Sequence, residues 1–220
     1  MPRILQMADD FAERFAFEPS RIAGIVKALR EAGLLKAGPR GKNAPDATAL
    51  DAARILIGMM LRLKHEDVAE GVRLFGGFKP NPGDEHASSA PATFEGALAQ
   101  ALKTLSAEGA REDRSRLVYI KINRDYCYGQ LHVAIRADDD DPRWDGEVDF
   151  DGIDHTISVR YLHPEFDASL ANQLTPTAQL LAAWRRYRSG FHEEPVLHPS
   201  DLIDIAQVLA GHDPPLEPAN

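Results

Sequence analysis

The chain has 220 residues and a formal net charge of −9 at pH 7, with 44% hydrophobic and 27% charged residues, as in an ordinary water-soluble globular protein of one or two domains. No apolar run approaches membrane-spanning length, and the single cysteine, Cys127, excludes an internal disulfide framework and a cysteine-based zinc site. The first residues carry acids and no apolar signal core, so we expect a cytoplasmic protein.

The first helices are expected within the N-terminal 76 residues. The spacing of apolar residues predicts four of them, at residues 2–16, 19–32, 49–63 and 66–76. In the first, we expect Ile4, Leu5, Phe11 and Phe15 to form the apolar side. Pro19 opens the second helix and Gly33 ends it, because proline is tolerated in the first helical turn and glycine after the last. Thr48 and Asp51 resemble a capping box before the third helix.

A stretch rich in Gly, Pro and Ser, residues 77–92, is expected to be a linker. After it, a helix is predicted from about Thr93, and alternating β-branched and aromatic residues predict strands. These strands are expected at 116–123, 128–136, 147–152 and 155–162, followed by helices at 175–188 and 198–211. The sequence therefore predicts an α+β protein, in which an N-terminal winged helix-turn-helix domain (1–76) precedes an acidic α+β domain (93–220) with a small antiparallel sheet.

Charge is distributed unevenly along the chain. Residues 1–80 hold 13 Lys and Arg and 10 Asp and Glu, a net of +3, whereas the remainder holds 12 and 24, a net of −12. Residues 19–45 are the most basic stretch, with six basic residues and one acid, Glu31. Such an asymmetry indicates two parts with different partners.

The second predicted helix has two unlike sides on a helical wheel. Its apolar side is expected to pack on the first and third helices, and it comprises Ile22, Ile25, Val26 and Leu29. The opposite side is small and polar with a positive rim, and it comprises Ser20, Arg21, Gly24, Lys27 and Ala28. Small residues would let the helix approach base edges closely, while the basic residues would reach bases or phosphates. We therefore interpret it as a recognition helix.

The residues that follow would form a wing. Lys36, Arg40 and Lys42 lie on a Gly-containing segment that can follow the DNA backbone or enter a minor groove. Arg30, near the end of the second helix, completes the predicted DNA-binding set.

The stretch FAERFAFEPSRIAGIVKALREAGLL resembles the winged-helix segment of MerR-type and excisionase-type regulators, over about residues 5–64. That resemblance implies that Ser20, Arg21, Gly24 and Lys27 lie on the recognition helix and that Arg40 and Lys42 lie on the wing. The stretch LREAGLLKAGPRGKNAPDATALDAARILI also resembles the start of uncharacterised proteins encoded by phages and prophages of α-proteobacteria, which suggests a mobile-element context.

No motif predicts an enzyme. The aspartates between Asp138 and Asp151 could hold Mg²⁺ or Ca²⁺, as in a metal-dependent nuclease, but their spacing is not that of an EF-hand. A solvated acidic loop explains them better. The eight histidines form no two-histidine metal motif, and no phosphate-binding loop or nucleophile motif occurs. We expect no metal and no cofactor.

The function expected from the sequence is specific binding of double-stranded DNA, as a transcriptional regulator of a phage-like element. Because one such unit contacts little DNA, a homo-oligomer is expected, with the acidic half available to a protein partner. The alternatives are a small-terminase-like DNA-packaging subunit, a protein-binding adaptor or inhibitor without DNA contact, and the metal-dependent nuclease.

Overall fold

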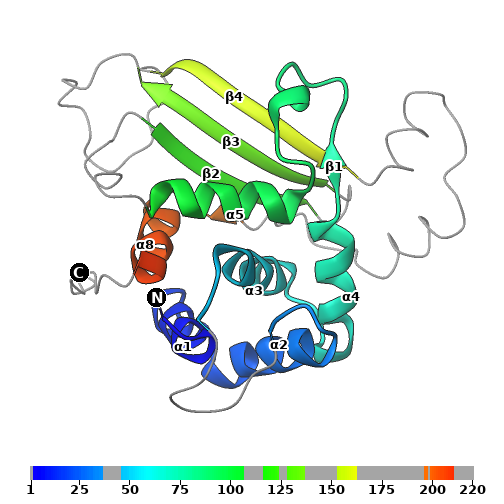
Figure 1. The fold of residues 1–220 in the computed structure, drawn as a ribbon, viewed down its shortest axis with the longest axis vertical. Coiled ribbons are helices and arrows are strands. Elements are labelled where there is room, and N and C mark those ends of the chain that lie inside the picture. The colour runs from blue at the N-terminus through cyan, green and yellow to red at the C-terminus, as the bar shows by residue number, and fades with distance from the viewer. Residues whose placement is uncertain are drawn as a thin grey trace, which may run out of the picture.

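The structure, a computed structural model, describes residues 2–36, 46–106, 116–123, 128–136, 153–162, 196–197 and 199–210. Within these residues the fold is α+β, with helices and an antiparallel sheet, as the sequence predicts (Figure 1). None of the helices in these ranges is both long enough and apolar enough to cross a membrane.

Four helices form one layer of the molecule. They are α1 (Ile4–Arg14), α2 (Pro19–Glu31), α3 (Ala49–Leu61) and α4 (His65–Gly76). The predicted capping box opens α3: the Thr48 backbone N–H donates to Asp51 at 2.8 Å, and the Asp51 N–H donates to the Thr48 hydroxyl at 3.2 Å. Almost every side chain of α3 is buried, so α3 is the centre of this layer. One prediction for α1 is wrong: Leu5 is 51% exposed, and Met7 and Ala8 take its place in the core.

A five-stranded antiparallel sheet forms the second layer, in the order β1-β4-β3-β2-β5. Its long strands are β2 (Arg116–Asn123), β3 (Tyr128–Arg136) and β4 (Ile153–Leu162), and its two-residue edge strands are β1 (Lys79–Pro80) and β5 (Val196–Leu197). The bounds of β2 and β3 are those predicted. The register pairs Ile120 with Leu131 and Leu131 with Val159, which puts these apolar residues on one face of the sheet.

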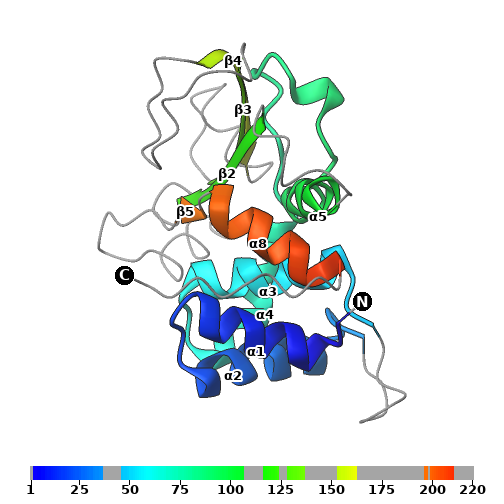
Figure 2. The same ribbon diagram turned by 90° about the vertical axis from the view of Figure 1, so that its left-hand side faces the viewer.

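Two helices lie between the sheet and the four-helix layer (Figure 2). They are α5 (Phe94–Leu105), which begins where the sequence predicts and which Thr93 caps by accepting the Gly96 N–H, and α8 (Pro199–Ala210). Phe94 packs 5.6 Å, centroid to centroid, from the ring of Tyr161 on β4, and it fills the space that Gly129 of β3 leaves by having no Cβ. A single buried apolar cluster runs from α1 through α3 and α5 to the sheet.

The segment expected to be a linker has defined structure. It contains β1 and a short 3-10 helix, η2 (Ala87–Ser89). Asp84 accepts hydrogen bonds from the backbone N–H of Arg160 at 2.7 Å and from its guanidinium at 2.7 Å, while Asn81 N–H donates to the Arg160 carbonyl. These bonds attach the segment to β4. The division of the chain into two domains remains a prediction.

Two predicted elements, the strand at 147–152 and the helix at 175–188, lie outside the described residues. The last predicted helix is confirmed as α8. The winged helix-turn-helix assignment remains a prediction, because the expected wing follows α2 and its central part, residues 37–45, also lies outside the described residues.

Candidate nucleic-acid interface

Helix α2 has the two unlike sides that its sequence predicts. Ile22, Ile25, Val26 and Leu29 are all buried, and they pack toward α1 and α3. Gly58 of α3 allows close contact here, because a Cβ at that position would lie only 2.9 Å from the Ile25 side chain. This packing fixes which side of α2 faces the solvent.

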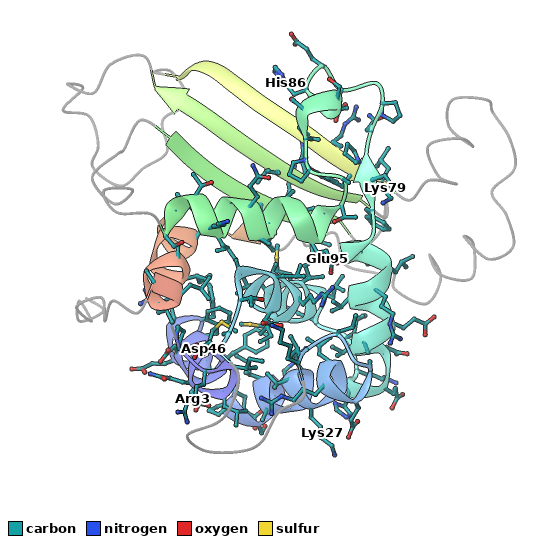
Figure 3. All side chains as sticks on the ribbon, viewed as in Figure 1. Arg3, Lys27, Asp46, Lys79, His86 and Glu95 are labelled. Carbon is teal, nitrogen blue, oxygen red and sulfur yellow. The ribbon has the colours of Figure 1, made fainter. Side chains whose placement is uncertain are left out.

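The solvent-facing side of α2 carries Ser20, Arg21 and Lys27, all of them exposed. Figure 3 shows Lys27 pointing away from the body of the molecule. Its ammonium lies 3.9 Å from the Glu31 carboxylate, an exposed pair that restrains it only weakly. The Arg21 guanidinium lies 5.2 Å from the centroid of the Phe17 ring, a cation–π distance, and the Ser20 hydroxyl donates to Glu18 at 2.7 Å.

The small residues of α2 are not an open surface, contrary to the prediction from the helical wheel. A Cβ at Gly24 would lie 3.5 Å from the His65 ring, and the Ala32 carbonyl accepts a 2.6 Å hydrogen bond from Arg73. These contacts, at the two ends of the stretch from Gly24 to Ala32, place α4 against α2. Ala28, between the two contacts, is 7% exposed. Small residues four apart therefore let α4 approach α2, and they do not form a bare floor for a DNA groove.

Arg30 is half-buried near the end of α2. Its Nε is buried and has no hydrogen-bond partner among the described residues. The predicted DNA-binding residue nearest to the end of the helix is therefore less exposed than Arg21 or Lys27.

The end of α2 is closed by the glycine that the sequence predicts. Gly33 has φ +71°, a conformation that favours glycine. Its N–H donates to the Arg30 carbonyl at 3.0 Å, and the N–H groups of Leu34 and Leu35 donate to the Leu29 carbonyl at 2.8 and 3.3 Å. The first two bonds make a Schellman motif, which sets the direction in which the chain leaves the helix.

Two arginines from other helices hold the carbonyls at this exit. Arg73 of α4 donates to Ala32, and Arg54 of α3 donates to Leu34 at 2.6 Å. Arg54 also forms a bidentate pair with Glu95 of α5, with donor to acceptor distances of 2.9 and 3.1 Å. The hydrogen bond to Glu95 raises the pKa of Arg54, and burial opposes this effect without reversing it. Arg54 is therefore a fully charged bridge between the α2 exit and α5.

Lys36, the first basic residue of the predicted wing, is exposed. Arg40 and Lys42 lie outside the described residues. The chain returns at Asp46, which forms an isolated antiparallel bridge with Arg3 just before α1 (Figure 3). The basic segment that begins at Lys36 is thus held on both sides: the Schellman motif precedes it, and the bridge between Asp46 and Arg3 follows it.

Arg54, Arg73 and Glu95 were not singled out by the sequence. Arg54 did offer a signal, because it is the only charged residue within the apolar run ARILIGMMLRL before its closing arginine. A charge on the buried side of a helix needs a partner, but the pattern does not say that the partner is Glu95, 41 residues later.

Among the described residues, no group of three His, Cys, Asp or Glu side chains could hold a metal ion. The aspartates from Asp138 to Asp151 lie outside these residues. No family model, curated protein or solved structure matches the chain.

Proposed function

We propose that the protein binds double-stranded DNA sequence-specifically, through the exposed side of α2 and the basic segment that follows it, as a transcriptional regulator of a phage-like element. The observation that carries this proposal is the exposure of Arg21, Lys27 and Lys36 on and just after a helix whose other side is fully packed. Basic side chains on a rigid helix, in a chain of net charge −9, are suited to a polyanion.

The mechanism is binding without turnover. The first turn of α2, with Ser20 and Arg21, would enter a major groove, where arginine reads guanine edges. Lys27 and Lys36 would contact phosphates, together with Arg40 and Lys42 of the predicted wing. A single α2 covers few base pairs, so the DNA-binding species would be a homo-oligomer.

The test is selection of bound sequences by the full chain from random double-stranded DNA, followed by affinity measurements over a range of salt concentrations. We expect an enriched motif and an affinity that falls steeply with salt. Replacing Arg21 and Lys27 with alanine should lower the affinity by about tenfold or more, and it should reduce the salt slope by about one for each phosphate that is no longer neutralised.

A matched control removes two other exposed lysines, Lys79 on β1 and Lys103 at the end of α5. It makes the same change in net charge away from α2, and we expect it to keep affinity within about twofold. The proposal is wrong if the full chain enriches no sequence, or if the control variant loses as much affinity as the α2 variant.

A protein-binding adaptor is the second candidate. It is favoured by the contact between α2 and α4 at Gly24, Ala28 and Ala32, which we call the seam. The seam covers the small residues that were expected to approach bases, and Glu31 lies beside Lys27 on the exposed side. An adaptor would bind its partner equally well after Arg21 and Lys27 are replaced. A packaging subunit would also bind DNA, and its mass in solution would identify it as a ring.

A further inference from the structure

The exit of α2, next to the proposed DNA-binding residue Lys36, is held by several hydrogen bonds. Leu34 and Leu35 are tied to Leu29 by their N–H groups, and the carbonyl of Leu34 is held from the other side by Arg54. Leu35 itself is buried. The next residue, Lys36, is exposed and begins the basic segment, so the direction of this segment is set by bonds made one and two residues before it.

Arg54 makes these contacts from a constrained position. It projects from the middle of α3, and its side chain and that of Glu95 are 20% and 22% exposed. Its three hydrogen bonds use Nε, Nη1 and Nη2, one to each acceptor oxygen. Only the planar fork of arginine can reach the two carboxylate oxygens and the carbonyl at once.

Glu95 is held as well. It lies in the first turn of α5, and a Cβ at Gly76 would come within 3.1 Å of its carboxylate, so the absence of a side chain at Gly76 makes room for it. The carboxylate is thus confined between the end of α4 and the guanidinium of Arg54. A chain of contacts leads from α5, which packs on the sheet, through Glu95 and Arg54 to the Leu34 carbonyl.

We propose that Arg54 is a positioning residue for the DNA-binding surface, with Glu95 as its partner, and that the pair sets the direction in which the basic segment beginning at Lys36 leaves α2. This inference rests on the proposed function for its effect on DNA, but its effect on the α2 exit can be measured without DNA. Opposite charges at positions 54 and 95 would not be sufficient to hold the α2 exit, because the hydrogen bond to the Leu34 carbonyl depends on the fork geometry of the guanidinium.

The experiment uses the full chain with Arg54→Lys or Glu95→Gln. Arg54→Lys keeps the charge and loses the fork, whereas Glu95→Gln keeps the shape and loses the charge. The matched control is Asp84→Asn, which breaks the comparable ion pair between Asp84 and Arg160 (2.7 Å), away from α2. Each variant is first checked for a native near-ultraviolet circular dichroism spectrum at the working temperature.

Two readouts are compared. In the free protein, we expect the amide hydrogens of Leu34 and Leu35 to exchange about tenfold faster in both variants of the pair and at the wild-type rate in the control. For duplex DNA, we expect the affinity to fall by about five- to thirtyfold with a smaller salt slope, because fewer phosphates are neutralised, and to stay within about twofold in the control.

The outcomes separate the two ideas. If the wild-type chain binds no duplex, the proposed function is wrong. The amide exchange rates of Leu34 and Leu35 then test only whether Arg54 and Glu95 position the α2 exit. Wild-type exchange in both Arg54→Lys and Glu95→Gln overturns that role, as does faster exchange with unchanged DNA affinity. Equal effects in the Asp84→Asn control would also overturn it, because they would reduce the result to a general loss of stability.

Discussion

The seam between α2 and α4 makes a prediction that the helical wheel alone contradicts. Ala28 is 7% exposed and lies between the Gly24 and Ala32 contacts with α4, whereas Ala23 on the same helix is exposed. Replacing Ala28 with leucine adds three carbon atoms to a close helix contact. Overpacking of this kind costs about 1–3 kcal/mol, and a value near 2 kcal/mol should lower Tm by about 4–8 °C in a chain of this length.

Ala23→Leu is the matched control for this substitution. It adds the same atoms on the same helix, where leucine and alanine have similar helix propensities, so its free energy of unfolding should stay within about 0.5 kcal/mol of the wild type. Urea unfolding followed by circular dichroism measures both variants, and the m-value shows whether the unfolded states remain comparable. Equal stabilities for the two variants would mean that Ala28 faces solvent, and the seam would be refuted.

Three further predictions concern the sheet and the segment attached to it. Gly129→Ala would bring a Cβ within 2.7–2.8 Å of three ring atoms of Phe94, so it should lower the free energy of unfolding by about 1–3 kcal/mol in chemical denaturation. The loss should be smaller in a Phe94→Leu background, and an equal loss in both backgrounds would contradict this contact. Burial would raise the pKa of Asp84, but hydrogen bonds from Arg160 outweigh it and hold the pKa below its ordinary 3.8. This carboxylate therefore stabilises the fold above about pH 4 and ceases to do so as the pH falls through the lowered pKa. In Asp84→Asn the free energy of unfolding should consequently fall less steeply below about pH 4, and the same steepness as in the wild type would contradict the role of Asp84. Burial raises the pKa of Tyr161 from 10.0 to about 12, so the unfolded chain loses this proton first and stability falls between these pH values. Its hydroxyl has no hydrogen-bond partner among the described residues, so Tyr161→Phe should remove that alkaline decline without loss of stability at pH 7, and a loss there would reveal a partner.

Local signals predicted most of the elements, because their chemistry acts within a few residues. Pro19 and Gly33 bound α2, and the reciprocal bonds of Thr48 and Asp51 open α3, as expected. The strands at 116–123 and 128–136 were found by their β-branched and aromatic residues. In each case the residue type and its immediate neighbours are sufficient to favour one backbone conformation.

The short strands and the surface of α2 were not predictable in the same way. A two-residue strand such as β1 has no periodicity to detect, and it forms because Asn81 and Asp84 bind the backbone of Arg160, far along the chain. On α2, small residues spaced by four are equally suited to a DNA groove and to a neighbouring helix. Only the tertiary position of α4 decides between the two, since it brings His65 to Gly24.

Helix α4 also limits which part of α2 could reach a DNA groove. Its contacts with α2 extend from His65 beside Gly24 to Arg73 at the Ala32 carbonyl, so they lie after the start of the helix, Pro19–Ala23. Recognition helices commonly contact bases with their first turns, which is the portion left open here. In the proposed function, base reading would accordingly fall to Ser20 and Arg21, and Lys27 would be a phosphate contact. The contact with α4 therefore narrows the base-reading part of the proposed interface to the start of α2, while Arg54 and Arg73 bind the carbonyls at its other end. The two ends of α2 would accordingly have separate roles.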